Sequence, residues 1–198
     1  MKTVITTVGT SLLENPPKVK IPLTLKKAIF DEWDSLLANI TEKQNEIKEK
    51  IANEAVDKLC AEVQTLLMIK KNYPNLVTYL ICTDTILSVM CADAIKPILE
   101  KHGIRVYFEH TREYIVEGLI VEGEKASKTF SETGFPNLIR VVRDIESKSG
   151  AENRPILNIS GGYKALIPVM TVMGQLYDME VNYVYEDGEE LIKLPKVP

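Results

Sequence analysis

Three short segments carry side chains and glycines that can bind a phosphate, and each follows a run of apolar or β-branched residues. They are loop 1 (Gly9-Thr10-Ser11), loop 2 (Thr83-Asp84-Thr85) and loop 3 (Ser160-Gly161-Gly162-Tyr163-Lys164). Glycine lets a phosphate approach the backbone, hydroxyls donate hydrogen bonds to it, and N–H groups at a helix start favour its charge. Lys164 adds a cation that we expect one turn into a helix. The three loops predict a site for a phosphate-bearing ligand.

Each loop also has a purely structural interpretation. Ser, Thr and Asp before a helix are common N-caps, and a Gly-Gly pair can simply form a turn. For loop 2 alone we favour helix capping. For loop 3 we favour binding, because a turn does not require the lysine. The occurrence of all three loops in one chain favours a site.

Alternating strands and helices should bring these loops together. Strands are expected at 3–8, 76–82, 104–108, 155–159, 181–185 and 191–194, and helices at 23–37, 84–101, 136–149 and 163–177. Residues 109–133 are a charged loop or irregular helix, and Asp187-Gly188 predicts a closing hairpin. This order predicts an α/β fold with a Rossmann-like, mostly parallel sheet flanked by helices. Ligands bind such a sheet beyond the carboxyl ends of its strands.

One long inserted helix is expected at 41–73. Its apolar residues recur in steps of three and four from Ile47 to Ile69, which places them on one helix face. Thr41 is the expected N-cap and Pro74 the expected terminator. With no repeat or linker in the sequence, we expect residues 1–198 to form a single domain that includes this helix.

The composition excludes several classes of function. The chain has 24 basic and 28 acidic residues and a net charge of −4, which disfavours a long nucleic-acid partner. No apolar run approaches the ~18 residues of a membrane span, and the first residues resemble a strand rather than a signal peptide. Three cysteines without a CxxC pair and two histidines give no metal signature. We expect a cytoplasmic protein with reduced thiols and no metal or cofactor.

Several nucleotide and hydrolase motifs are absent from the sequence. It contains no GxGxxG fingerprint, no GxxxxGK[ST] loop and no GxSxG elbow. A dinucleotide-binding enzyme, a Walker-type hydrolase and a serine hydrolase of the elbow type are therefore not supported.

Two segments together resemble a known family. They are Val8-Gly9-Thr10-Ser11-Leu12-Leu13 after the first strand and Asn158-Ile159-Ser160-Gly161-Gly162-Tyr163-Lys164-Ala165 near the end. The chain resembles the CARF domain, the CRISPR-associated Rossmann fold that senses cyclic oligoadenylates in type III CRISPR immunity. The last strands, 181–185 and 191–195, also fit. The resemblance spans essentially the whole chain and is weakest in the middle.

The resemblance implies a homodimer that binds one cyclic oligoadenylate across its two-fold axis. A ring of four or six identical nucleotides has even symmetry, so two copies of one site can hold its halves. Tyr163 and Tyr114 are candidates for stacking on adenine, and Arg112 for contacting the ligand unless it pairs with a nearby glutamate. The expected ligand-binding residues are Gly9, Thr10, Asn15, Thr83, Asp84, Thr85, Arg112, Ser160, Gly161, Gly162 and Tyr163.

Short CARF proteins resemble ring nucleases, which cleave cyclic tetra-adenylate. By motif position, Ser11 and Lys164 match the catalytic residues of those enzymes. The reaction needs no metal: a ribose 2′-OH attacks its own phosphorus and leaves a 2′,3′-cyclic phosphate. Ser11 would hydrogen-bond a non-bridging oxygen or orient the ribose hydroxyl, and Lys164 would offset the charge of the phosphorane. The alternative is a non-catalytic sensor whose effector lies on a partner or on a further C-terminal part.

Two further patterns are not interpreted as effector sites. Arg105 and His110 match the R-x4-H pattern of HEPN ribonucleases, but residues five apart on an extended chain point to opposite faces. Asp144, Glu146 and Lys148 loosely match a nuclease triad and fit better as the mixed-charge rim of a helix.

Overall fold

A computed structural model describes the chain except for residues 15–18, 121–124, 151–152, 186–187, 189 and 197–198. Its centre is a seven-stranded sheet in the order β3-β2-β1-β5-β6-β7, with β4 paired to the end of β2. The strands are β1 (Lys2–Val8), β2 (Leu76–Thr83), β3 (Arg105–Tyr107), β4 (Ile115–Val116), β5 (Ile156–Asn158), β6 (Glu180–Val184) and β7 (Leu191–Lys193). Every pairing is parallel except that of β6 with β7. The Rossmann-like fold and the closing hairpin are confirmed, while the Asp187 half of the hairpin turn lies outside the described residues.

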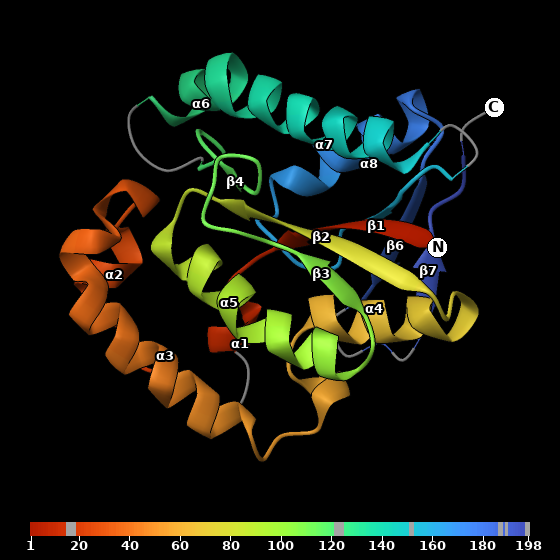
Figure 1. The fold of residues 1–198 in the computed structure, drawn as a ribbon. Coiled ribbons are helices and arrows are strands. Elements are labelled where there is room, and N and C mark those ends of the chain that lie inside the picture. The colour runs from red at the N-terminus through yellow and green to blue at the C-terminus, as the bar shows by residue number, and fades with distance from the viewer. Residues whose placement is uncertain (15–18, 121–124, 151–152, 186–187, 189, 197–198) are drawn as a thin grey trace.

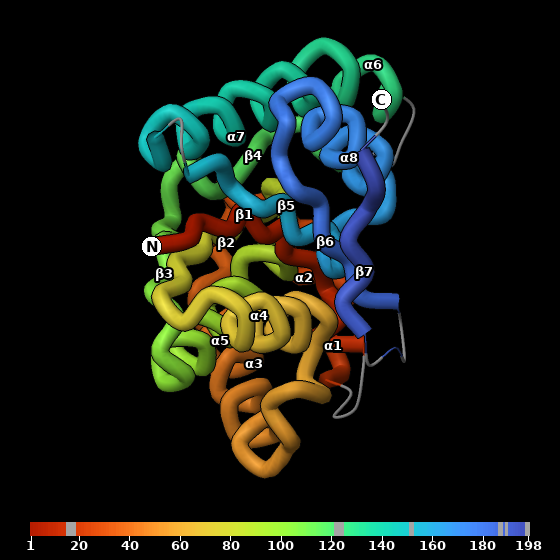
Figure 2. Tube along the Cα trace, turned by 90° about the vertical axis from the view of Figure 1, so that its right-hand side faces the viewer, coloured from red at the N-terminus to blue at the C-terminus, as the bar shows by residue number. Residues whose placement is uncertain are grey.

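Helices cover both faces of the sheet (Figures 1 and 2). One face carries α1 (Ser11–Glu14), α2 (Leu23–Lys27), α3 (Leu37–Ile51), α4 (Ala61–Asn72) and α5 (Ile86–Lys101), and the other carries α6 (Ala126–Thr129), α7 (Phe135–Ser149) and α8 (Leu166–Leu176). β1 is therefore buried on both sides: Val4 joins the apolar cluster under the first layer and Ile5 the cluster under the second. This is why its residues 3–8 are all β-branched and show no regular alternation of apolar and polar residues.

The prediction of one long helix at 41–73 is wrong. The segment forms the carboxyl part of α3, a 3₁₀ turn at Val56–Lys58, and α4. Thr41 lies inside α3, where its hydroxyl donates to the Leu37 carbonyl at 2.8 Å instead of capping a helix. A straight helix of this length would extend about 50 Å. Folding it back lets Ile47 of α3 and Leu66 of α4 enter the same apolar cluster, so the apolar spacing continues across the break.

The helix expected at 23–37 is also interrupted. α2 ends at Lys27, and two 3₁₀ turns follow at Phe30–Glu32 and Asp34–Leu36. Between α2 and the first 3₁₀ turn, the backbone of Ala28 and Ile29 is extended, and the segment pairs with loop 2: Phe30 N–H donates to the Asp84 carbonyl at 2.8 Å, and Ile29 bridges Thr85. These tertiary hydrogen bonds replace the helical ones.

Residues 109–133 contain more regular structure than expected. Ile115 and Val116 form the short strand β4, and α6 continues through a π-helical turn at Phe130–Gly134 into α7. A strand of two residues leaves no alternating pattern for a sequence to reveal.

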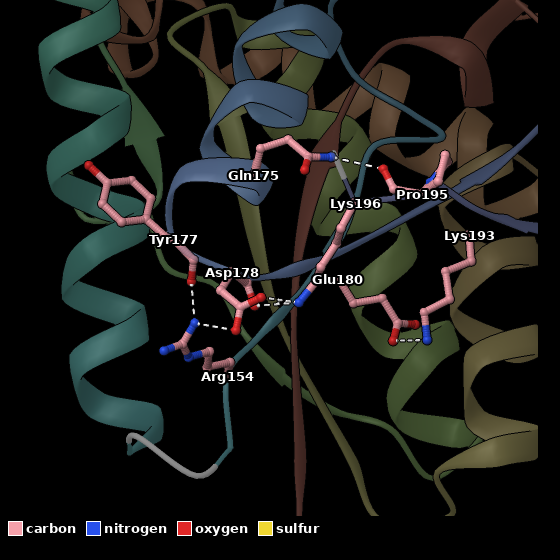
Figure 3. A network of polar contacts seen from close by, with 8 residues as sticks. All are labelled: Arg154, Gln175, Tyr177, Asp178, Glu180, Lys193, Pro195 and Lys196. Atoms are coloured by element: carbon pink, nitrogen blue, oxygen red, sulfur yellow. Dashed lines mark hydrogen bonds and ion pairs between the residues drawn. The ribbon is translucent and has the colours of Figure 1, made fainter. Parts of the chain in front are cut away.

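A polar network lies where α8 is connected to the start of β6, at the end of the sheet opposite the loops of the site (Figure 3). Arg154 donates to the Tyr177 carbonyl at 3.0 Å and pairs with Asp178 at 2.7 Å. Lys196 also pairs with Asp178, and this hydrogen bond is the main reason why the pKa of Asp178 is lowered. Gln175 donates to the Pro195 carbonyl at 3.0 Å. The chain after β7 is thereby held against the end of α8, opposite the carboxyl ends of the strands.

In the described part of the chain, no helix is long and apolar enough to span a membrane.

Candidate functional site

Loops 1 and 3 lie in direct contact at the point where the strand order of the sheet reverses. From β1 the chain continues to β2 on one side, and it later returns through β5 on the other side. The two backbones touch closely: a Cβ added to Gly9 would lie 2.7 Å from the Gly162 nitrogen. The Thr7 hydroxyl donates to the Gly161 carbonyl at 2.7 Å. Such a crevice is where open α/β sheets bind their ligands.

The glycines of loop 3 are needed for this contact. Gly162 has a φ of +99°, and a Cβ there would lie 2.7 Å from the Thr7 hydroxyl oxygen. A Cβ on Gly161 would lie 2.0 Å from the carboxyl carbon of Glu62. Both glycines therefore let the loop pass directly over β1 and α4, which keeps their backbone groups at the crevice.

A buried carboxylate lies beneath the two loops. Glu62 is 1% exposed, and its Oε1 accepts a hydrogen bond from Gly9 N–H at 2.8 Å. Its Oε2 accepts a hydrogen bond from the Ser11 hydroxyl at 3.0 Å. Glu62 is the second residue of α4, where the helix dipole stabilises a negative charge. These three interactions compensate for its burial.

Our interpretation of the sequence missed Glu62, although a signal was present. Glu62 lies three residues after Leu59 and four before Leu66, both of which are fully or almost fully buried. Helical spacing therefore places an acid on the apolar face of the segment. An acid in that position requires hydrogen-bond donors from elsewhere in the fold, and here loop 1 supplies them.

Ser160 is used inside the fold. Its hydroxyl oxygen accepts from Val184 N–H at 2.8 Å and lies 2.7 Å from the Thr65 hydroxyl oxygen. Its own N–H donates to the side-chain oxygen of Asn158 at 3.2 Å. Ser160 thus connects loop 3 to α4 and β6, and contributes to the site by holding the loop.

Lys164 and Tyr163 lie between the glycines and α8. The helix begins at Leu166, so the expectation that Lys164 lies one turn into it is wrong. The carbonyls of both residues instead accept the first N–H groups of α8. The Lys164 side chain is exposed, and no ion pair or hydrogen bond of its ammonium is found among the described residues. Tyr163 is partly buried against the apolar cluster under α7 and α8.

Loop 2 caps α5, as the structural interpretation predicted. Thr85 accepts the Ser88 N–H at 3.2 Å and lies 2.9 Å from the Thr83 hydroxyl, oxygen to oxygen. Asp84 accepts the Gly118 N–H at 3.3 Å, and burial raises the pKa of this carboxyl. The Ser88 hydroxyl donates to the Val8 carbonyl at 2.8 Å, so loop 2 lies next to the strand that leads into loop 1.

The remaining candidates lie around these loops. The Thr10 hydroxyl donates to Glu14 at 2.9 Å, and Asn15 lies outside the described residues. Arg112 forms an ion pair with Asp31, an aspartate rather than the expected glutamate. Its guanidinium lies 5.8 Å from the ring centroid of Phe30. Tyr114 is partly buried against both apolar clusters.

Residues 57–197, well over half of the chain, match the family model described as CRISPR-associated protein (Cas_APE2256). The chain belongs to this family. No curated protein matches it.

The match to the CRISPR-associated family covers most of the candidate site. Glu62, loop 2 and loop 3 lie within the matched residues, whereas loop 1 precedes them. Loop 1 nevertheless contacts Glu62 and Gly162 directly. Loop 1, which lies outside the matched residues, therefore contacts two residues that lie within them.

The two patterns set aside as effector sites have other partners in this CRISPR-associated chain. Arg105 donates to the Met1 sulfur, whereas the His110 ring bonds to Asp93 at 3.0 Å. Lys148 lies 3.8 Å from Glu113. Among the described residues, no three His, Cys, Asp or Glu side chains are grouped to hold a metal ion.

Proposed function

We propose that this CRISPR-associated protein binds a cyclic oligoadenylate at the crevice between β1 and β5, and that it cleaves the ring. The contact between loops 1 and 3 carries the proposal. It brings hydroxyl groups and close-approach glycines to the strand-order reversal of the sheet, and Lys164 follows these glycines directly in the chain. The resemblance to CARF ring nucleases and the CRISPR family both support this ligand class.

The net charge agrees with a small polyanion as ligand. At −4, the protein has no overall attraction for a long nucleic acid, so phosphates must be held by local groups. Lys164 is exposed and lacks an acidic partner among the described residues, so its charge is available to a phosphate. The loop backbones supply further donors, whereas the Thr10 hydroxyl donates its proton to Glu14.

Cleavage would proceed by internal attack. The 2′ oxygen of one adenylate forms a bond to the adjacent phosphorus while the bond from phosphorus to the 5′ oxygen breaks. The 2′ proton passes to water, and the departing 5′ oxygen takes a proton from water. Two such events convert cyclic tetra-adenylate into two linear di-adenylates ending in 2′,3′-cyclic phosphate. Alignment of the ribose and a cation near the phosphorane are what the protein contributes.

A second copy of the chain would complete the ring site. α8 follows loop 3 directly and contains no charged residue. Pro168, Val172 and Leu176 recur every four residues along its exposed side, and Val172 and Leu176 are 54% and 72% exposed. An apolar stripe beginning next to the site supports a homodimer through α8. Light scattering should then show a dimer, and Leu176→Glu should produce a monomer that binds the ring more weakly.

The function is tested with cyclic tetra-adenylate and the full chain in EDTA, with products followed by mass spectrometry. We expect linear di-adenylate with a cyclic phosphate, and loss of this product in Ser11→Ala and Lys164→Ala. Lys101→Ala and Ser127→Ala, at exposed positions on α5 and α6, are the matched controls and should cleave normally. Failure to bind rings of either four or six adenylates would overturn the proposal.

The non-catalytic sensor is the second candidate, and one observation favours it. The Ser11 proton is engaged by Glu62, so the hydroxyl is not free to donate to a phosphorane oxygen. In the same assay, tight binding with the ring intact after hours would identify a sensor. Its output would then pass to a partner.

A further inference from the structure

We infer that Glu62 is a positioning residue that makes Ser11 a hydrogen-bond acceptor for a ribose 2′-OH, so that loop 1 selects ribose rings over deoxyribose rings. This inference rests on the proposed function, since it names the group of the ring that Ser11 binds, the ribose 2′-OH. It assigns Glu62 a role in ligand selection, in addition to its structural contacts.

The direction of one hydrogen bond carries the inference. A serine hydroxyl has a single proton, and a carboxylate can only accept. Ser11 Oγ lies 3.0 Å from Glu62 Oε2, so the proton points into the protein. Only the lone pairs of Oγ then face the crevice. Ser11 can accept a hydrogen bond from a ligand but cannot donate one.

The surroundings of Glu62 keep this direction fixed. Its other oxygen accepts Gly9 N–H at 2.8 Å. The Gly161 backbone covers the carboxylate so closely that a Cβ there would lie 2.0 Å from Glu62 Cδ. With 1% of the residue exposed, water does not compete for either oxygen. Any rearrangement of the Glu62 side chain or of its hydrogen bonds would leave buried polar groups unpaired, which is energetically unfavourable.

The two candidate catalytic residues, Ser11 and Lys164, therefore have different roles. Phosphate oxygens only accept hydrogen bonds, and Ser11 has no free proton to donate to them. The buried negative charge of Glu62 beneath Ser11 would also repel a phosphate directly above it. A ribose 2′-OH can donate to Ser11. Of the two roles open to Ser11, orienting the ribose hydroxyl therefore fits the structure, and the phosphates are left to Lys164 and the loop backbones.

The substitution Glu62→Gln reverses the hydrogen bond without changing the shape. Gly9 N–H needs an acceptor, so the amide oxygen faces it and the amide nitrogen faces Ser11. Ser11 then accepts from the amide and presents its own proton to the crevice. Glu49→Gln, on the exposed side of α3, is the matched control.

The experiment compares the affinities of cyclic tetra-adenylate and its all-2′-deoxy-2′-fluoro counterpart by calorimetry at low temperature, with ring integrity checked by mass spectrometry. The fluorine can accept a hydrogen bond from Ser11 but cannot donate one to it, so the pair of rings reports the direction of the hydrogen bond. We expect wild type and Glu49→Gln to prefer the ribose ring by a factor at least ten times larger than the preference of Ser11→Ala. The preference of Ser11→Ala measures the effect of sugar conformation alone. Glu62→Gln should lose that excess preference. Its cleavage rate should fall like that of Ser11→Ala, and the double variant should be no slower than Ser11→Ala, because both act through one hydroxyl.

The outcomes separate the inference from the proposed function. If wild type binds or cleaves the ring but its ribose preference equals that of Ser11→Ala, the positioning role is overturned and the ring-binding function stands. A Glu62→Gln variant that unfolds at the wild-type temperature and keeps the full preference also overturns it. If wild type binds neither ring, both proposals fail.

Discussion

A methyl group on Gly9 should force loops 1 and 3 apart. The Cβ of Gly9→Ala would lie 2.7 Å from the Gly162 nitrogen, 2.9 Å from its Cα and 3.2 Å from its carbonyl carbon. All three distances are below the 3.4 Å at which ordinary contact begins. The opposing atoms belong to the backbone, so no side chain can turn aside to relieve the clash.

The expected cost follows from this overlap. Overpacking that requires backbone movement destabilises proteins by about 1–3 kcal/mol. Relief here requires a shift of several tenths of an ångström between two loops that also hold Glu62, so we expect about 2 kcal/mol. For a chain of 198 residues this lowers the melting temperature by about 4–8 °C.

Thermal unfolding followed by circular dichroism measures this loss, and Gly150→Ala provides a control. Gly150 has a φ of +82°, and a Cβ there would meet nothing within 4 Å. Its variant is destabilised through the backbone alone, by about 1–3 kcal/mol. Both variants should lose stability, but only Gly9→Ala should also lose ring binding. A Gly9→Ala variant that melts within 1 °C of wild type, or binds the ring unchanged, would refute the close contact of the loops.

Three further predictions concern other groups near the site. Thr85→Ala removes the cap of α5 and should cost about 1 kcal/mol in urea unfolding, whereas an unchanged midpoint would contradict the cap. Burial raises the pKa of Asp84, so the folded chain holds this proton more tightly than the unfolded chain and loses stability as pH rises above the ordinary value of 3.8. Asp84→Asn should reduce that decline between pH 4 and 7, and parallel profiles would contradict it. Cys60, Cys82 and Cys91 are buried, which raises the pKa of each thiol, so all three should react with a disulfide reagent only after denaturation; labelling of the native protein would show that a thiol is accessible.

The sheet could be predicted from the sequence because its signals are local. β1 and β2 are rich in β-branched and apolar residues and end at a glycine or a polar loop, and parallel strands buried on both faces require such runs. The position of a bend in a helical segment leaves a weaker signal. Residues 41–73 keep their apolar spacing through the turn at Val56–Lys58 because α3 and α4 pack into the same cluster. Periodicity shows which residues are buried but not where the axis changes direction.

For the site, sequence reasoning identified loops 1 and 3 but not what lies between them. Glycines and hydroxyls at strand ends are visible in the sequence, and the topology of the sheet brings them together. Glu62 belongs to a helix more than fifty residues away from Ser11. Its role depends on the tertiary contact of α4 with loop 1. Arg112 and Asp31 likewise come from segments far apart in the chain.

The contact between the loops depends on the register of the central strands, and buried polar groups hold that register. The Thr6 and Thr78 hydroxyl oxygens lie 2.9 Å apart across β1 and β2, and the Asn158 amide reaches Thr6 from β5 at 3.5 Å. All three residues are fully buried, so each hydroxyl or amide needs its partner. A slip of one residue would turn these groups into the apolar cluster on the opposite face of the sheet. The polar row thus fixes where β1 and β5 end relative to each other, and so determines that Gly9 meets Gly162 and that Glu62 lies beneath both loops.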